Sequence, residues 1–153
     1  MSGRRFTLDT NILIYAVDSR AGARQGLAAE VIERAARGDC RLTLQAVSEF
    51  YAAVTRKGIV PARDAAMIAA DWMALFPCAP ASEGALRLAL DAAAAGRAAY
   101  WDALLVASAA EAGCAAVLTE DLGDGGTLFG VRIVNPFAAD CVAAAALEVL
   151  GGG

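Results

Sequence analysis

The segment AAYWDALLVASAAEAG, which spans residues 98–113, is the strongest constraint on how this chain folds. Between Ala98 and Ala110 the only ionisable side chains are those of Tyr100 and Asp102. The pattern predicts a helix that ends at Gly113, and a helix that is apolar all round is normally buried on most sides. The carboxylate within it needs a partner, because buried charges are paired or bind metals. The rest of the chain must supply both the packing and that partner.

Strand and helix patterns alternate along the chain. Short apolar runs bounded by turn residues predict strands, whereas a 3.6-residue period and end signals such as Gly38 predict helices. We expect strands at 4–8, 41–44, 114–119 and 131–136, and helices at 23–38, 45–58, 61–76, 82–96 and, as a tail, 137–150. Residues 77–81 are expected to form a break with room for a short strand, and residues 122–130 a loop. Such alternation is typical of an α/β sandwich with a mostly parallel sheet.

The composition fits one cytoplasmic domain. The chain has 153 residues, of which 58% are hydrophobic, and this is enough for one sizeable core. Charges or glycines interrupt every apolar run before the roughly 18 residues that a membrane span needs. The N-terminal segment places Asp9 in its only apolar stretch, which makes it a poor signal peptide. We therefore expect a protein of the cytoplasm without a membrane segment.

The chain contains no histidine, and Lys57 is its only lysine. This excludes histidine acid–base chemistry, Ser-His-Asp and Cys-His nucleophiles, and histidine metal ligands. Any catalysis must rest on carboxylates, hydroxyls, cysteines or arginine. A net charge of −4 argues against broad nucleic-acid affinity through a basic surface, although it leaves room for a local basic rim.

The cysteines show no metal-binding or redox spacing. No CxxC motif occurs, and in a cytosolic chain such residues are usually small, buried thiols. We expect this of all four: Cys40, Cys78, Cys114 and Cys141.

Four acidic residues map to one predicted edge of the sheet. Asp9 ends the first strand, Glu49 lies one turn into the helix after the second, and Asp121 follows the AAVLT strand. Asp102 lies in the first turn of its own helix. Because functional groups gather at the carboxyl ends of parallel strands, these carboxylates are expected to meet. A shared metal ion would then be the partner that Asp102 requires.

Each carboxylate also has a purely local interpretation. Asp9 fits a helix N-cap, a role compatible with metal binding, and Asp102 could only complement a helix dipole. Glu49 could be a solvated residue in mid-helix, although Ala46 and Phe50 share its face. Asp121 could belong to a solvated acidic loop. Their common position at strand ends is the argument for a joint site.

A cluster of carboxylates without histidine suits Mg²⁺ or Mn²⁺, since both ions prefer oxygen ligands. The usual task of such a site is phosphoryl transfer, in which a metal ion activates water and stabilises the leaving oxygen. Asn11 and Thr119 are short polar residues suited to orienting the carboxylates by hydrogen bonds.

At these residues the chain resembles a PIN-domain ribonuclease, specifically the VapC-like toxins of type II toxin–antitoxin pairs. The resemblance runs from Phe6 to Phe137 and is carried by four motifs in the same order with matching spacing. The motifs are FTLDTNILIYAVD, LTLQAVSEFYAAVTRKG, AYWDALLVASAAEAGCAAVLTEDL and VRIVNPF. It implies a single PIN-like domain over residues 1–153, with a core at 4–137 and a tail at 138–153. The implied fold is a three-layer α/β/α sandwich with a small, mostly parallel sheet.

The resemblance also implies a site and partners. Asp9, Glu49, Asp102 and Asp121 match the acidic, metal-binding positions of the family, and Asn11 and Thr119 match its supporting positions. Glu120 and Asp124 compete with Asp121 for the fourth acidic place, and Asp121 is preferred because it matches the family's T-x-D. The implied activity is Mg²⁺-dependent cleavage of single-stranded or looped RNA by a homodimer that a small antitoxin neutralises.

Two other classes remain open from the residues alone. A metal-dependent phosphatase of the haloacid-dehalogenase kind needs a second aspartate where this chain has Asn11, and a lysine after a later strand, whereas Lys57 ends a helix. The other class is a non-catalytic PIN-like interaction module, against which four intact carboxylates argue. The cations expected near the site, to contact RNA phosphates, are Arg20, Arg24, Arg56, Lys57 and Arg63.

Overall fold

The computed structural model describes residues 5–151. Its main sheet has four strands in the order β1-β4-β6-β5. The strands β1 (Phe6–Leu8), β4 (Ala116–Leu118) and β6 (Val131–Val134) are parallel, and β5 (Thr127–Leu128) is antiparallel to β6. The carboxyl ends of β1, β4 and β6 therefore lie at the same edge, where a residue that follows one strand meets residues that follow the next.

A second, two-stranded parallel sheet continues beyond β1. It pairs β2 (Leu42–Thr43) with β3 (Cys78–Ala79). A parallel bridge joins Phe6 to Cys40, and the backbone N–H of Arg41 donates to the carbonyl of Phe6 at 2.9 Å. The end of β2 consequently faces the same way as the end of β1.

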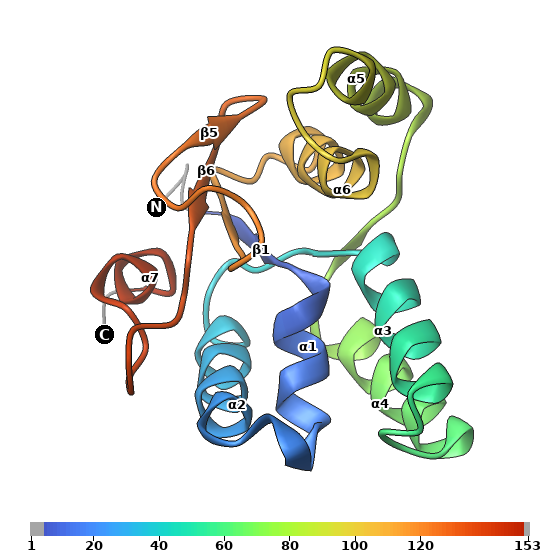
Figure 1. The fold of residues 1–153 in the computed structure, drawn as a ribbon, viewed down its shortest axis with the longest axis vertical. Coiled ribbons are helices and arrows are strands. Elements are labelled where there is room, and N and C mark those ends of the chain that lie inside the picture. Colours follow the sequence, from blue (N-terminus) through green and yellow to red (C-terminus); the bar gives the residue numbers. More distant parts are fainter. Residues whose placement is uncertain (1–4, 152–153) are drawn as a thin grey trace.

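Helices cover both faces of this sheet. Figure 1 shows α5 and α6 packed together on one side, α1, α2 and α7 on the other, and α3 with α4 beside α1. This arrangement confirms the predicted α/β fold with a small, mostly parallel sheet. The helices are α1 (Thr10–Val17), α2 (Ala23–Ala35), α3 (Leu44–Arg56), α4 (Ala62–Leu75), α5 (Glu83–Ala94), α6 (Tyr100–Glu111) and α7 (Ala144–Val149).

Helix α6 is buried as its composition predicts. Every residue from Ala103 to Ala109 is buried. On one side Leu105 and Val106 join the main core, and on the other Ala103 and Ala107 pack with the alanines of α5. Small side chains at that helix pair let the two backbones approach closely, which holds the first turn of α6 at the end of β1 and β2.

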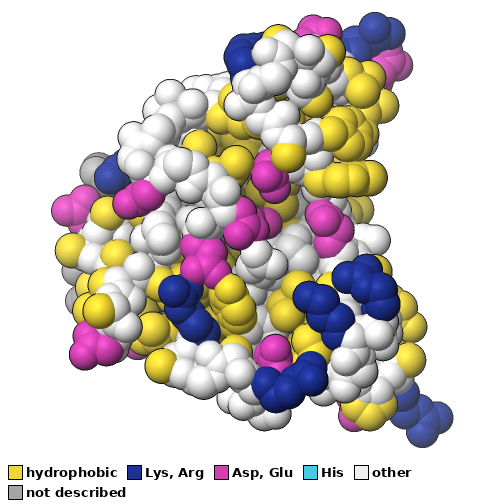
Figure 2. Space-filling model, viewed as in Figure 1, with side chains coloured by type: hydrophobic (Ala, Val, Ile, Leu, Met, Phe, Trp, Pro, Cys, Tyr) yellow, Lys and Arg dark blue, Asp and Glu magenta, His cyan; other side chains and the backbone are white. Residues whose placement is uncertain are grey.

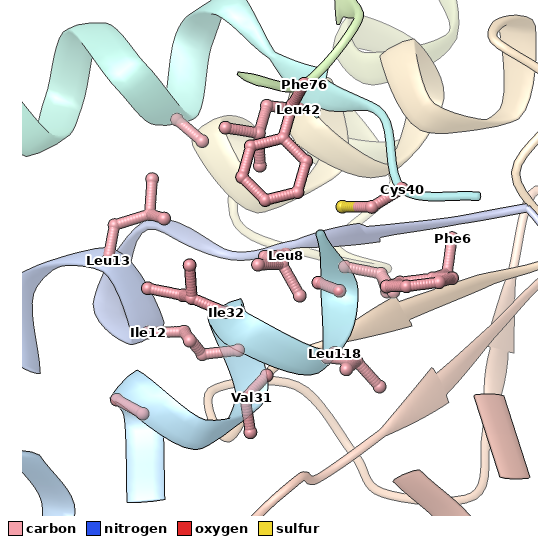
Figure 3. Close-up of a cluster of buried hydrophobic side chains, with 14 of the residues drawn as sticks. Phe6, Leu8, Ile12, Leu13, Val31, Ile32, Cys40, Leu42, Phe76 and Leu118 are labelled. Atoms are coloured by element: carbon pink, nitrogen blue, oxygen red, sulfur yellow. The ribbon is translucent and has the colours of Figure 1, made fainter. Parts of the chain in front are cut away.

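The main core lies between the sheet and the helices that follow β1. Figure 3 shows Phe6 and Leu8 of β1 pointing toward Ile12 of α1 and Val31 of α2, with Leu118 of β4 beside them. All five side chains are at most 1% exposed. This packing anchors the point at which β1 passes into α1.

Two sequence predictions are corrected at the C-terminal end. Residues 122–130 are expected to be loop, but Phe129 and Gly130 take positive φ of 52° and 76° and form a two-residue hairpin turn, so that Leu128 pairs with Val131. Residues 137–150 were expected to be one helix, but only Ala144–Val149 are helical. The residues before this helix instead form an antiparallel bridge between Phe137 and Val142. Val142, Ala146 and Leu150 join the main core, so the tail packs on the domain.

The cysteines differ in exposure. Cys40 and Cys114 are buried and Cys78 is partly buried, but Cys141 is exposed, so the expectation of four buried thiols is wrong for Cys141. Burial raises the pKa of Cys114 to about 11 and moves the pKa of Cys40 in the same direction. These two thiols stay protonated near neutral pH.

None of the helices within residues 5–151 combines the length and apolar character that a membrane crossing requires. The predicted strand at 4–8 begins one residue before the described part of the chain. The predicted tail at 138–153 extends two residues beyond it.

Candidate functional site

Asp9 stands at the junction of β1 and α1. Its backbone N–H donates to the carbonyl of Leu118 at 2.9 Å, which places it directly beside the end of β4. Its carboxylate caps α1 by accepting from the N–H of Thr10 at 2.7 Å, and it accepts from the hydroxyl of Thr119 at 2.6 Å. The side chain is only 8% exposed. The N-cap role and a place in the acidic cluster coexist.

Thr119 connects the two strand ends. It is fully buried directly after β4, and its hydroxyl both donates to Asp9 and accepts from the backbone N–H of Asp121 at 3.1 Å. Asp121 itself is exposed, yet its carboxylate accepts a hydrogen bond from the amide of Asn11 in α1. The supporting positions expected from the sequence thus contact the carboxylates that they were expected to orient.

The other two carboxylates come from helices. Thr43 at the end of β2 caps α3 by accepting from the N–H of Ala46 at 3.0 Å, and this starts the helix so that Glu49 points toward the sheet edge. Asp102 is half-buried in the first turn of α6, where no side chain caps the helix. Both helices begin at or near the edge where β1 and β4 end.

Gln45 is a residue that the sequence analysis missed. Its amide nitrogen donates to Oε1 of Glu49 at 2.8 Å and to the carbonyl of Trp101 at 2.9 Å, so it ties α3 to α6. The spacing of four between Gln45 and Glu49 on one helix face was the available signal. Trp101 lies 56 residues from Gln45 in the sequence, so no local pattern indicates that the two are hydrogen-bonded.

These side chains line one pocket with a volume of about 290 Å³. Figure 2 shows acidic side chains gathered near the centre of this face, with Lys and Arg side chains on α3 and around it. The polar and charged residues that line the pocket are Asp9, Thr10, Asn11, Gln45, Glu49, Arg56, Lys57, Asp102 and Asp121. The four predicted carboxylates therefore share one cavity, although they come from four separate elements.

The carboxylates act on one another electrostatically. Burial raises the pKa of Asp9, opposed by its hydrogen bonds from Thr119 and Thr10, and the charges of Asp102 and Glu49 raise it further. Burial also raises the pKa of Asp102, to which Asp121 adds. The pKa of Asp121 is raised by burial, then by Asp9 and Glu120. Like charges are thus held together in a partly desolvated space, where a cation would be stabilised.

The donor set suits a hard divalent cation. All the candidate ligands are oxygen atoms, as Mg²⁺ and Mn²⁺ prefer. Within residues 5–151 no three Asp, Glu or Cys side chains lie close enough together to bind one metal ion jointly. Mg²⁺ in proteins commonly keeps several water ligands and binds only one or two carboxylates directly. The open arrangement of this pocket is compatible with that mode of binding.

Only two of the five expected cations reach the pocket. Arg56 and Lys57 line it from the end of α3. Arg20 pairs instead with Asp18 at 3.5 Å, and Arg63 lies exposed in the first turn of α4. Arg24 is held away from the pocket, because its guanidinium pairs with Glu120 and lies 4.6 Å from the centre of the Phe137 ring.

The two competitors of Asp121 are engaged elsewhere. Glu120 accepts hydrogen bonds from Tyr15 and Arg24. Asp124 accepts from the backbone N–H of Asn135 at 2.9 Å, which closes the loop before β5. Asp121 is the residue of the three that lines the pocket.

Comparison with known proteins gives the family. The family model described as PIN domain matches residues 6–123, a span that contains all four carboxylates. The chain belongs to the PIN domain family. No curated protein sequence matches it well enough to count as a relative.

Three solved structures share its fold. VapC20 of Mycobacterium tuberculosis, described as a Sarcin-Ricin loop cleaving toxin, is 15% identical with a TM-score of 0.60, covering 76% of this chain and 91% of its own. VapBC2 of Rickettsia felis, bound to a promoter DNA fragment, is 12% identical with a TM-score of 0.61, covering 84% and 96%. DNA-bound VapBC of Salmonella typhimurium is 15% identical with a TM-score of 0.58, covering 87% and 97%.

The raised pKa of Asp102 predicts how neutralising it changes stability. A carboxyl whose folded pKa lies above its unfolded value stabilises the fold only when protonated, and that contribution is lost as pH rises through the folded pKa. In EDTA at pH 7 we therefore expect Asp102→Asn to be more stable than wild type. The advantage should disappear as pH falls toward about 4, near the ordinary pKa of aspartate. Thermal unfolding of both proteins across this range measures it.

Asp64→Asn is the matched control. Asp64 occupies the same third position of α4, which also lacks a side-chain cap, but it is exposed. Its replacement should give no gain at pH 7 and a loss of roughly 0.3–1 kcal/mol from the helix dipole. A stability loss of that size in Asp102→Asn as well would show that Asp102 only complements its helix.

Proposed function

We propose that this PIN domain is a divalent-metal-dependent endoribonuclease, active with Mg²⁺ or Mn²⁺, and the toxin of a type II toxin–antitoxin pair. One observation carries the proposal. Four carboxylates from four separate elements, Asp9, Glu49, Asp102 and Asp121, line one pocket at the carboxyl edge of the sheet. The fold shared with VapC structures supports it.

Asp9, Glu49, Asp102 and Asp121 would hold the metal directly or through water. A bound Mg²⁺ or Mn²⁺ supplies Lewis-acid stabilisation of phosphate oxygens and activates a water for attack on phosphorus. The remaining work falls to side chains that orient the ligands. Thr119 fixes the rotamer of Asp9, and Asn11 that of Asp121.

The cations at the end of α3 complete the site. Arg56 and Lys57 line the pocket opposite the acidic groups and can hold the phosphates on either side of the cleaved bond.

The proposed protein partners are a second copy of the chain and an antitoxin. Large apolar side chains remain exposed on α4 and α5, such as Leu75 at 55% and Leu90 at 51%, and burial of exposed apolar patches favours association. The acidic pocket suits a basic side chain, so an antitoxin arginine that meets the carboxylates would cover the site. An RNA-cutting toxin held by an antitoxin would act in the cytoplasm.

Metal dependence is the first test. Purified protein should cleave single-stranded RNA with Mg²⁺ or Mn²⁺ and stop in EDTA. A metal at about 100 times its dissociation constant should add roughly 2.7 kcal/mol to the free energy of unfolding. Asp102→Asn should lose most of that increment and nearly all cleavage, whereas Asp64→Asn should keep both. Full activity in excess chelator would overturn the metal mechanism.

Thr119 gives a test of carboxylate orientation. Thr119→Val keeps the shape of the side chain but removes the hydroxyl that donates to Asp9 and accepts from the backbone N–H of Asp121. Loss of such a supporting bond typically lowers metal affinity or activity about 10- to 100-fold. Thr119→Ser should restore both, because it returns the hydroxyl. Mn²⁺-dependent thermal shifts and cleavage rates measure the effect, and wild-type values in Thr119→Val would show that Asp9 needs no such support.

The two proposed protein assemblies are tested by measuring molar mass in solution and by co-expression. Light scattering should give a homodimer at micromolar concentration, and co-expression with the neighbouring small gene should give a heterocomplex without RNA cleavage. Replacing Leu86 and Leu90 of α5, or Met67 and Leu75 of α4, by glutamate would identify the surface involved. A monomer at high concentration that binds no partner would contradict both proposed assemblies.

A further inference from the structure

A groove opens directly beside the acidic pocket. It has a volume of about 420 Å³ and lies between α3, the chain after β3 and the start of α6. Figure 2 shows hydrophobic side chains next to the acidic group on this margin of the face. Its lining residues are Leu44, Gln45, Ser48, Glu49, Pro80, Ala81, Trp101 and Leu104. Three of them, Gln45, Glu49 and Trp101, also line the acidic pocket, so the two cavities are adjacent.

Packing within the domain does not explain why Trp101 lies exposed in this groove. Its side chain is 59% exposed, although it is one of the two tryptophans and immediately precedes Asp102. The ring is not loose, because the Tyr100 ring packs against it at 4.8 Å with an interplanar angle of 66°. The result is a flat apolar surface held open to solvent beside the carboxylates.

Gln45 fixes this surface relative to the acidic site. Its amide donates to the carbonyl of Trp101 and to the carboxylate of Glu49. A ligand lying on Trp101 therefore has a defined position relative to the pocket. Arg56 and Lys57 line the pocket itself, so an anionic group there has cations to meet it.

The required ligand has two parts, an anion for the pocket and a flat apolar group for the groove. We propose that the groove receives the base of an unpaired nucleotide adjacent to the cleaved phosphate, and that Trp101 is the stacking surface. This rests on the proposed ribonuclease function and assigns a specificity-determining residue to it. Stacking on an aromatic side chain requires a base free of its pair, so the site selects unpaired RNA and tolerates different bases.

A nucleotide fits this groove better than a protein segment does. Pockets for small ligands have volumes of about 300–1,000 Å³, and this groove is of that size. It ends in a pocket that combines carboxylates with two cations, a charge pattern that suits a phosphate bound with a metal ion. A protein partner seated on Trp101 is the competing explanation, and the experiment separates the two.

Intrinsic fluorescence reports on Trp101 directly. Trp72 is partly buried against Phe50, and Trp72→Phe keeps an aromatic ring there while leaving Trp101 as the sole tryptophan. This variant is titrated with an oligoadenylate, with Ca²⁺ in place of Mg²⁺, and with a strand of equal length that lacks bases. Oligoadenylate should quench the fluorescence. The abasic strand should not quench it and should bind roughly 5- to 150-fold more weakly, the range expected for one stacked base.

Substitutions at Trp101 test whether stacking is the cause. Trp101→Leu should weaken oligoadenylate binding by a similar factor and raise the KM for cleavage more than it lowers kcat. Trp101→Phe should retain most of the affinity because its ring still stacks. Tyr51→Leu, which removes an exposed aromatic ring on α3 outside both cavities, should behave as wild type. Circular dichroism confirms that each variant is folded.

The outcomes distinguish this inference from the proposed function. If wild type cleaves RNA with Mn²⁺ but both Trp101→Leu and Trp101→Phe bind oligoadenylate as tightly as wild type does, the stacking role is overturned. The ribonuclease function then still stands. If Trp101→Leu loses dimerisation or antitoxin binding while its RNA affinity is unchanged, the groove is a protein interface and the inference is overturned. If wild type neither binds nor cleaves RNA with Mn²⁺, the proposed function fails as well.

Discussion

The hydrogen bond between Thr119 and Asp9 joins the two strand ends on which the site depends. Four like-charged groups do not gather spontaneously, and burial, with repulsion as a smaller cause, raises the pKa values of Asp9, Asp102 and Asp121. The parallel pairing of β1 with β4 supplies the opposing force, because the backbone N–H of Asp9 donates to the carbonyl of Leu118, which brings Asp9 beside Thr119. The core of Phe6, Leu8 and Leu118 beneath them keeps that pairing in register. Stability in the body of the domain therefore offsets electrostatic strain at its edge.

Repulsion between like charges distinguishes the acidic pocket from the ion pairs elsewhere in the domain. Arg24 and Glu120 show the structural pattern, in which opposite charges meet and an aromatic ring covers the guanidinium. Asp9, Asp102 and Asp121 show the reverse, since the charges that shift their pKa values are those of other carboxylates. Sites that break local rules are usually those where function requires it. The acidic pocket is the place in the described chain where this conflict is concentrated.

Much of this arrangement could be predicted from the sequence. The apolar segment around Asp102 required a buried helix, and the positions of Asp9 and Asp121 after strands indicated a common edge. These signals are local, because each depends on a period or on a residue next to a strand. The pairing partners of Arg24 and Glu120, the bond from Gln45 to Trp101 and the strand at Thr127–Leu128 could not be predicted, since each depends on contacts that only the folded chain creates. The same limit explains why Arg20, Arg24 and Arg63 were expected near the site but lie outside the pocket.

The order of the acidic residues along the chain also determines when the site can exist. Asp9 is made more than a hundred residues before its strand partner β4 and the Thr119 hydroxyl. During synthesis the ribosome releases Asp9, Glu49 and Asp102 before the segment that gathers them. A nascent chain that ends before β4 has three of the four carboxylates but lacks the strand and the Thr119 hydroxyl that position Asp9. The complete pocket can therefore form only after Asp121 has been synthesised.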